Sequence, residues 1–181
     1  MITDCYDIET ETIIHLRDFY GEQKHMVDRC LIIFSKEIHA HLLSTYDCEE
    51  ISCFHACNGN IPIYKMNYKG TDIAFYLTAI GSALASCLCY EANWLTGATK
   101  FIMFGSCGSL NREKTEGKFI IPTESYRGEG CSYYFAKPAD YITIKNSSKL
   151  SAIFDKMNVP YVSGRDVLHI FLDGCIDFLE E

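Results

Sequence analysis

Short apolar runs that predict buried strands alternate with helical segments along this chain, and this alternation limits the possible folds most. The predicted strands are Arg29–Phe34, about Glu50–Cys57, Ile61–Tyr68, Thr71–Ala79, Phe101–Phe104, Lys118–Pro122 continuing to Tyr126, and Tyr161–Ser163. The predicted helices run from Ser35, as the N-cap, to about Tyr46, from Ser82 to Leu95, and over 146–158. Because strands and helices are interspersed, we predict an α/β sandwich with a twisted central sheet.

Glycines mark where several of these elements end. Lys69 and Gly70 fit a two-residue turn between neighbouring strands, and Gly97 fits the stop of the second long helix. The first 20 residues read as an irregular arm with a short helical stretch, and the spacing of Leu168, Phe171 and Ile176 in the last 16 residues is near helical. A length of 181 residues predicts one domain.

Charge and composition exclude several classes of function. The net charge is −8 and no cluster of Lys or Arg stands out, so we expect no nucleic-acid partner. No stretch reaches the roughly 18 apolar residues of a membrane span, and the acidic N-terminus does not resemble a signal peptide. We therefore expect no membrane partner, a cytoplasmic location and reduced thiols for the ten cysteines.

One group of side chains has the spacing of metal ligands. Cys53, His55 and Cys57 would share one face of a strand and could form a three-ligand corner. The alternative is that they are weakly polar strand residues, because free cysteine behaves as a small hydrophobe. No Cys-x-x-Cys pair completes a structural zinc site, so we expect no bound metal.

The strongest local signal is the run Gly105-Ser106-Cys107-Gly108, which follows a predicted buried strand. Two glycines allow a sharp turn and close approach of a ligand, and Ser106 adds a hydroxyl beside backbone amides. This is the layout of an anion nest at the carboxyl end of a strand, where open α/β sheets bind ligands. Gly81-Ser82, between a strand and a helix, could admit a phosphate or ribose to a helix N-terminus. Taken alone, either segment could also be a plain turn.

A second motif spans Ser125 to Pro138. Arg127 could orient a polar ligand there, and the aromatic run Tyr133–Phe135 could cover a base or a sugar face. Alternatively, Arg127 pairs with Glu129 or Glu124 and the aromatic side chains only pack.

Together these stretches resemble the nucleoside phosphorylase superfamily, and uridine phosphorylase most closely. The glycine run is similar to the family's Gly-Ser/Thr-x-Gly phosphate and ribose loop. The second motif fits the pattern Ser-x-Arg-x-x-Gly-x-Ser-x-x-Phe-Ala-x-Pro at Ser125, Arg127, Gly130, Ser132, Phe135, Ala136 and Pro138. The resemblance runs from about residue 5 to residue 164, so that 1–20 form the arm, 21–164 the family core and 165–181 a divergent tail.

The resemblance implies a three-layer α/β/α sandwich with a mixed central sheet, assembled as a homodimer or homohexamer. It implies phosphorolysis of a ribonucleoside, with uridine favoured and a purine nucleoside next, inorganic phosphate as co-substrate and no cofactor. The residue roles that it implies are phosphate and ribose binding for Gly81, Gly105 and Ser106, the base pocket for Cys107 and Gly108, and support for Arg127 and Ser132.

Three departures from the family pattern leave alternatives open. Phe104 stands where the family usually has Arg, and Ser35-Lys36-Glu37 stands where it has Gly-Asp-Pro followed by a phosphate-binding Arg, so Lys36 would be a point charge in its place. After Gly164 the base-recognition stretch is not matched, and the later ribose-binding segment is missing, so we expect a chain cut short before its active site is complete. The alternatives are a nucleoside hydrolase of the same superfamily and a non-catalytic remnant or binding module.

Overall fold

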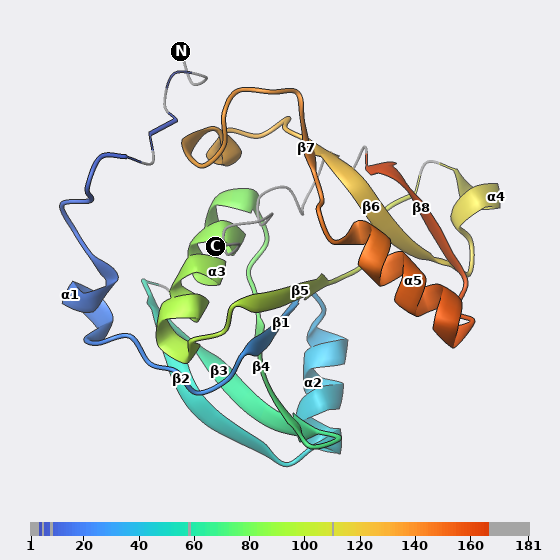
Figure 1. Ribbon diagram of the computed structural model, residues 1–181. Helices are drawn as coiled ribbons and strands as arrows, with labels where there is room; N and C mark the ends of the chain where they lie inside the picture. The colour runs from blue at the N-terminus through green and yellow to red at the C-terminus, as the bar shows by residue number, and fades with distance from the viewer. Residues whose placement is uncertain (1–3, 5, 8, 58, 110, 167–181) are drawn as a thin grey trace. The chain divides into compact units, whose positions relative to one another are not determined.

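The computed structural model describes residues 4, 6–7, 9–57, 59–109 and 111–166, and these form two compact units (Figure 1). We call residues 10–106 the N-terminal unit. The described residues from 107 to 166, with those before residue 10, form the C-terminal unit. The predicted helical spacing at Leu168, Phe171 and Ile176 lies outside the described residues, and the single-domain organisation stays a prediction.

The N-terminal unit is built on a five-stranded mixed sheet in the order β2-β3-β4-β1-β5. Its strands are β1 (Arg29–Ile33), β2 (Cys48–Ala56), β3 (Gly59–Tyr68), β4 (Thr71–Leu77) and β5 (Lys100–Phe104). β1 lies between β4 and β5 and is parallel to both, whereas β3 is antiparallel to β2 and to β4. The parallel half of the sheet therefore has all its carboxyl ends at one edge.

Both faces of this sheet are apolar. Ile33 and Phe75 are fully buried on one face, where Ile38 and Leu42 of α2 (Lys36–Thr45) pack against them. The alternating residues Ile32, Ala74 and Tyr76 are fully buried on the opposite face, because successive strand residues point to opposite sides. Two covered faces explain why the strands read as almost continuous apolar runs.

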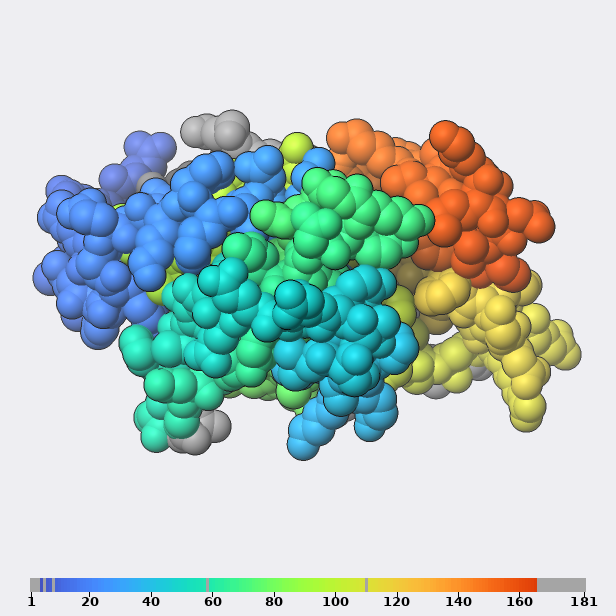
Figure 2. All heavy atoms as spheres, turned by 90° about the horizontal axis from the view of Figure 1, so that it is seen from below, coloured from blue at the N-terminus to red at the C-terminus, as the bar shows by residue number. Residues whose placement is uncertain are grey.

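The helices of this unit begin and end as the sequence indicates. The Ser35 hydroxyl accepts a hydrogen bond from the Ile38 amide (3.3 Å), which caps α2. Figure 1 shows α2 beside the sheet, and in Figure 2 its atoms lie next to those of the start of β2, coloured blue to cyan. α1 (Leu16–Tyr20) is the short helical stretch of the arm. α3 (Ser82–Thr96) is largely buried and ends at Gly97, which is left-handed (φ 79°).

The C-terminal unit has a three-stranded sheet in the order β7-β6-β8. β6 (Phe119–Tyr126) is antiparallel to β7 (Tyr141–Thr143) and parallel to β8 (Tyr161–Asp166). α5 (Ser147–Met157) packs its Phe154 ring edge-on against Phe119 (5.3 Å) and Tyr161 (5.8 Å). The crossover from β6 to β8 thus packs a partly exposed aromatic cluster against the helix.

The predicted strands and helices are confirmed, with three corrections. The segment 111–117, for which the sequence predicts no helix or strand, contains the one-turn helix α4 (Arg112–Thr115), since the Asn111 side chain accepts from the Lys114 amide (3.1 Å). The short strand β7 and the 3-10 helix η2 (Cys131–Tyr134) carry no periodic signal and were not predicted. β4 ends at Leu77, two residues before its predicted end at Ala79.

Gly97 offers a test of this packing. A Cβ added there would lie 2.6 Å from the Cα of His25 and 2.8 Å from the Lys24 carbonyl oxygen, whereas one added at Gly70, which has nearly the same φ (80°), would meet nothing within 4 Å. Both Gly97→Ala and Gly70→Ala pay about 1–2 kcal/mol for a left-handed alanine. We expect Gly97→Ala to lose roughly 1–3 kcal/mol more from overpacking, measured by urea unfolding. Equal losses would contradict this packing.

Candidate functional site

The carboxyl edge of the three parallel strands gathers most of the residues predicted to bind a ligand. Ile33 is paired with both Leu77 and Phe104, so β1, β4 and β5 end level with one another. The hydrogen bonding continues one residue further. The Thr78 amide donates to the Ile33 carbonyl (2.9 Å) and the Phe34 amide donates to the Phe104 carbonyl (2.9 Å). Gly81, Ser35 and Gly105 therefore all follow strands that end at the same edge.

Gly81 is the N-cap residue of α3 and has a positive φ of 108°. Its carbonyl oxygen accepts from the Ala85 amide (2.9 Å), which closes the first turn of the helix. A Cβ at this position would meet no atom within 4 Å, so the backbone conformation and not crowding favours glycine there. The first amides of a helix have no intrahelical acceptor, which suits an anion.

Gly105 is close to the neighbouring strand. A Cβ at Gly105 would lie 2.9 Å from the Cβ of Phe34, closer than real Cβ contacts come. Ser106 follows in an exposed position, and its hydroxyl has no hydrogen-bond partner within the described part of the chain. The structure thus places the Ser106 hydroxyl, which has no hydrogen-bond partner among the described residues, at the strand edge. It directly follows Gly105, where there is no room for a side chain.

In the described part of the N-terminal unit, Lys36 is the basic residue that follows one of these strand ends. Lys36 is exposed at the start of α2, directly after β1 and its N-cap. The adjacent Glu37 accepts from the Ser35 hydroxyl (2.7 Å), and this hydrogen bond, with a smaller effect of Lys36, lowers the pKa of the Glu37 carboxyl. Arg29 and Lys100 stand at the opposite ends of β1 and β5, so among residues 10–57 and 59–106 no arginine follows one of these strand ends.

A half-buried histidine of α2 packs against this sheet. The ring of His39, on α2, lies 5.7 Å from that of Phe75 and 5.8 Å from that of Tyr64. Burial lowers its pKa, and its Nε2 atom is buried without a hydrogen-bond partner among the described residues.

A shallow pocket of about 450 Å³ opens elsewhere in the N-terminal unit, where Phe19, Tyr20 and His55 line it. The Tyr20 hydroxyl donates to Glu91 (2.6 Å), and burial together with this bond raises the pKa of Tyr20 to about 12. None of the predicted phosphate, ribose or base contacts lines the pocket.

The suspected metal corner is occupied by ordinary contacts. The His55 ring stacks on that of Tyr20 (5.5 Å), and its Nδ1 lies 3.2 Å from Oδ1 of Asn60. No group of three His, Cys, Asp or Glu side chains in the described part of the chain could hold a metal ion. Cys53 and His55 lie on β2, whereas Cys57 lies in the turn beyond it.

In the C-terminal unit, Arg127 is enclosed by its own loop. The side chain is only 5% exposed and donates to the Ser132 hydroxyl (2.8 Å) and to the carbonyl oxygens of Lys137 (2.5 Å) and Ala136 (3.1 Å). Its guanidinium also lies 4.1 Å from the Tyr133 ring centroid. Every edge of the guanidinium thus faces the loop that it braces.

The acidic residues near Arg127 have other partners. The Glu129 carboxylate accepts from the Ser132 hydroxyl and from the amides of Cys131 (2.5 Å) and Ser132 (3.0 Å), and Glu124 pairs with Arg165 (2.7 Å). The sequence-based alternative of a direct Arg127 pair with Glu129 or Glu124 is therefore not what the geometry shows. Ser132 connects Arg127 to Glu129 instead. The supporting roles of Arg127 and Ser132 stay predictions.

The remaining predicted residues also lie in the C-terminal unit. Cys107 and Gly108 are exposed, and a Cβ at Gly108 would meet nothing within 4 Å. Tyr134 and Phe135 expose 52% and 41% of their surface, so they do not simply pack into a core. The predicted roles of Cys107 and Gly108 in a base pocket stay predictions.

Sequence reasoning missed Phe34 as a member of the strand edge. An aromatic residue at the end of an apolar run reads as one more core position, and only the close approach of Gly105 shows that its Cβ faces the glycine turn.

Three comparisons relate the chain to known proteins. A family model described as the phosphorylase superfamily matches residues 28–167. No curated protein matches the chain.

None of the described helices is long and apolar enough to cross a membrane.

Solved structures share the fold at low identity. Uridine phosphorylase from Vibrio fischeri has a TM-score of 0.62 at 22% identity, over 82% of this chain and 66% of its own. Helicobacter pylori MTAN has 0.58 at 15%, over 77% and 68%, and a futalosine hydrolase mutant of that species has 0.59 at 14%, over 81% and 69%. The chain thus spans about two thirds of these proteins. The predicted mixed sheet with flanking helices is confirmed.

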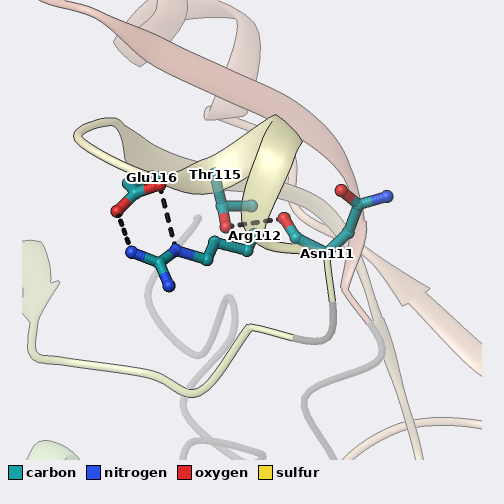
Figure 3. A network of polar contacts seen from close by, with 4 residues as sticks. All are labelled: Asn111, Arg112, Thr115 and Glu116. Atoms are coloured by element: carbon teal, nitrogen blue, oxygen red, sulfur yellow. Dashed lines mark hydrogen bonds and ion pairs between the residues drawn. The ribbon is translucent and has the colours of Figure 1, made fainter.

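Two arginines in the C-terminal unit, Arg127 and Arg112, allow a matched test of whether Arg127 stabilises its loop. Arg112 pairs with Glu116 (2.6 Å) on α4, where it is 83% exposed (Figure 3). We expect Arg127→Lys to lower the free energy of unfolding by about 2 kcal/mol, because a lysine cannot reach all three buried acceptors. Arg112→Lys should leave it unchanged within the error of a urea titration. Equal effects of the two substitutions would show that Arg127 does not brace its loop.

Proposed function

The chain belongs to the phosphorylase superfamily, and on that premise we propose that it cleaves the N-glycosidic bond of a ribonucleoside by phosphorolysis. The products would be the free base and ribose 1-phosphate. Uridine is the favoured substrate and a purine nucleoside the next. Inorganic phosphate is the co-substrate, and the proposed reaction uses no cofactor.

The observation that carries this proposal is the shared carboxyl edge of β4, β1 and β5. There Gly105 and Ser106 follow one strand, Gly81 and the α3 N-terminus follow another, and Lys36 follows the strand between them. Backbone amides, a hydroxyl and a cation are the groups that bind phosphate and the polar edge of a sugar. Ligands of open α/β sheets bind at this edge.

The proposed chemistry asks the protein mainly to position two reactants. A phosphate oxygen forms a bond to the anomeric carbon while the bond from that carbon to the base nitrogen breaks, and the electron pair leaves with the base. Charge develops on the ribose in an oxocarbenium-like state, and the anionic phosphate beside it stabilises this charge. Gly81, Gly105 and Ser106 would hold phosphate and ribose in place.

Hydrolysis is a second candidate, favoured by the charge at the edge. A guanidinium binds phosphate through two parallel hydrogen bonds, and no arginine follows these strand ends in the described part of the N-terminal unit. Lys36 supplies only a point charge. Water as the nucleophile would need no anion clamp, and Helicobacter pylori MTAN and the futalosine hydrolase are described as a nucleosidase and a hydrolase.

Assembly and location belong to the same proposal. We propose that this enzyme of nucleoside salvage forms a homodimer or homohexamer, as the resemblance implies. We also propose that it lies in the cytoplasm, as the sequence predicts. Cys107 and Gly108 would shape the base pocket.

Base release from uridine and inosine, with and without inorganic phosphate, tests the proposal. We expect release that depends on phosphate and yields ribose 1-phosphate. Equal release without phosphate would favour hydrolysis, and no turnover of any nucleoside would contradict both reactions and favour a binding module or remnant.

Substitution of Ser106 tests the site itself. We expect Ser106→Ala to lower kcat/KM about tenfold, the equivalent of one hydrogen bond of about 1.4 kcal/mol. The matched control is Ser44→Ala on α2, because Ser44 is also exposed and its hydroxyl donates only to the His41 carbonyl (2.9 Å). The site would be wrong if Ser106→Ala and Ser44→Ala had the same activity.

A further inference from the structure

We propose that Phe34 is a positioning residue, whose Cβ fixes the path of the Gly105–Ser106 turn and so places the Ser106 hydroxyl. The inference rests on the proposed function, because it concerns the same strand edge. It adds a residue that touches neither phosphate nor nucleoside and acts through Gly105.

Phe34 is held on both sides by the backbone. Its amide donates to the Phe104 carbonyl (2.9 Å), which extends the parallel pairing of β1 with β5 by one residue. The preceding Ile33 is fully buried and its carbonyl accepts from the Thr78 amide (2.9 Å). The following Ser35 caps α2. A Cβ attached to so constrained a backbone cannot move without disturbing the sheet or the helix.

A side chain added at Gly105 would meet this constrained Cβ of Phe34. A Cβ at Gly105 would lie 2.9 Å from the Phe34 Cβ, but 3.5 Å and 3.6 Å from Cγ and Cδ2 of the ring. The last two distances are ordinary van der Waals contacts, so rotation of the phenyl ring would not relieve the clash. The backbone at Gly105 is therefore the part that would have to shift.

A shift at Gly105 passes directly to Ser106. The two residues are adjacent in an exposed segment, and the Ser106 hydroxyl has no other partner among the described residues to hold it. Displacement of a binding group by about 1 Å can reduce a rate about 100-fold. Phe34 thus determines where the first uncommitted hydroxyl beyond the sheet lies.

The test is a double-mutant cycle that separates the Cβ of Phe34 from its ring. We expect Gly105→Ala to lower kcat/KM about 100-fold and to raise the KM for phosphate. Combined with Phe34→Gly, which removes the Cβ, the same substitution should cost less than tenfold relative to Phe34→Gly alone. Combined with Phe34→Ala, which removes the ring and keeps the Cβ, it should still cost about 100-fold.

Stability is controlled separately. Urea unfolding of each variant gives the folded fraction under assay conditions, and a variant that is merely less stable keeps its KM for phosphate and loses kcat only by that fraction. Gly164→Ala, at a glycine of β8 with open space and an ordinary φ, is the control for glycine replacement and should leave activity unchanged.

A second measurement covers the case in which Phe34→Gly does not fold. Amide hydrogen exchange at Gly105 and Ser106 should be equal in Phe34→Ala and in Phe34→Leu, because both variants keep the Cβ.

Two results would overturn the inference while leaving the proposed function intact. One is an active unsubstituted chain in which Gly105→Ala costs the same with Phe, Ala or Gly at position 34. The other is faster hydrogen exchange at Gly105 and Ser106 in Phe34→Ala than in Phe34→Leu, because the side chain beyond the Cβ would then hold the turn. Loss of turnover in the unsubstituted chain itself would instead contradict the proposed function and the positioning role together.

Discussion

The parallel pairing of β1 with both β4 and β5 is the interaction on which the rest of the N-terminal unit depends. It buries Ile32 and Ile33 completely on opposite faces, and it makes three strands end level at one edge. The hydrogen bonds of Thr78 and Phe34 then carry the register one residue past the strands. As a result, the segments that follow β1, β4 and β5 lie at one edge of the sheet. The strand pairing alone places them there, so no contact between their side chains is required.

Polar groups in this protein fall into two kinds, and the difference bears on chemistry. Arg127 donates hydrogen bonds to acceptors of its own loop through all three of its nitrogen atoms, so few of its donors are left to bind a ligand. Ser106 and Lys36 are exposed and uncommitted among the described residues. A buried, satisfied group resists rearrangement, whereas an uncommitted group at a rigid edge is available for binding.

Much of this arrangement could be predicted from the sequence because its determinants are local. The cap at Ser35, the turn at Lys69-Gly70 (φ 50° and 80°) and the stop at Gly97 each follow from one or two residues. β7 and η2 could not be predicted, since elements of three and four residues have no period to detect. The hydrogen bonds from Arg127 to Ser132 and from Ser132 to Glu129 were not predicted. A sequence shows that Arg127 and Glu129 carry opposite charges, but it does not show that a hydroxyl lies between them. The Phe34–Gly105 contact depends on strand register, which only the folded sheet determines.

In the proposed reaction, the choice between phosphate and water as the nucleophile would depend on the charges at this strand edge. A lysine at the start of α2 offers an anion one flexible charge, and the Glu37 carboxylate beside it, whose pKa the Ser35 hydroxyl lowers, opposes a second negative group. The amides at Gly81 and α3 favour an anion without regard to its geometry. The proposed phosphate binding would therefore rest on backbone donors held in place, which makes the path of the Gly105–Ser106 turn more important than it would be beside a guanidinium clamp. If that path is loose, water, which needs no such placement, becomes the better nucleophile.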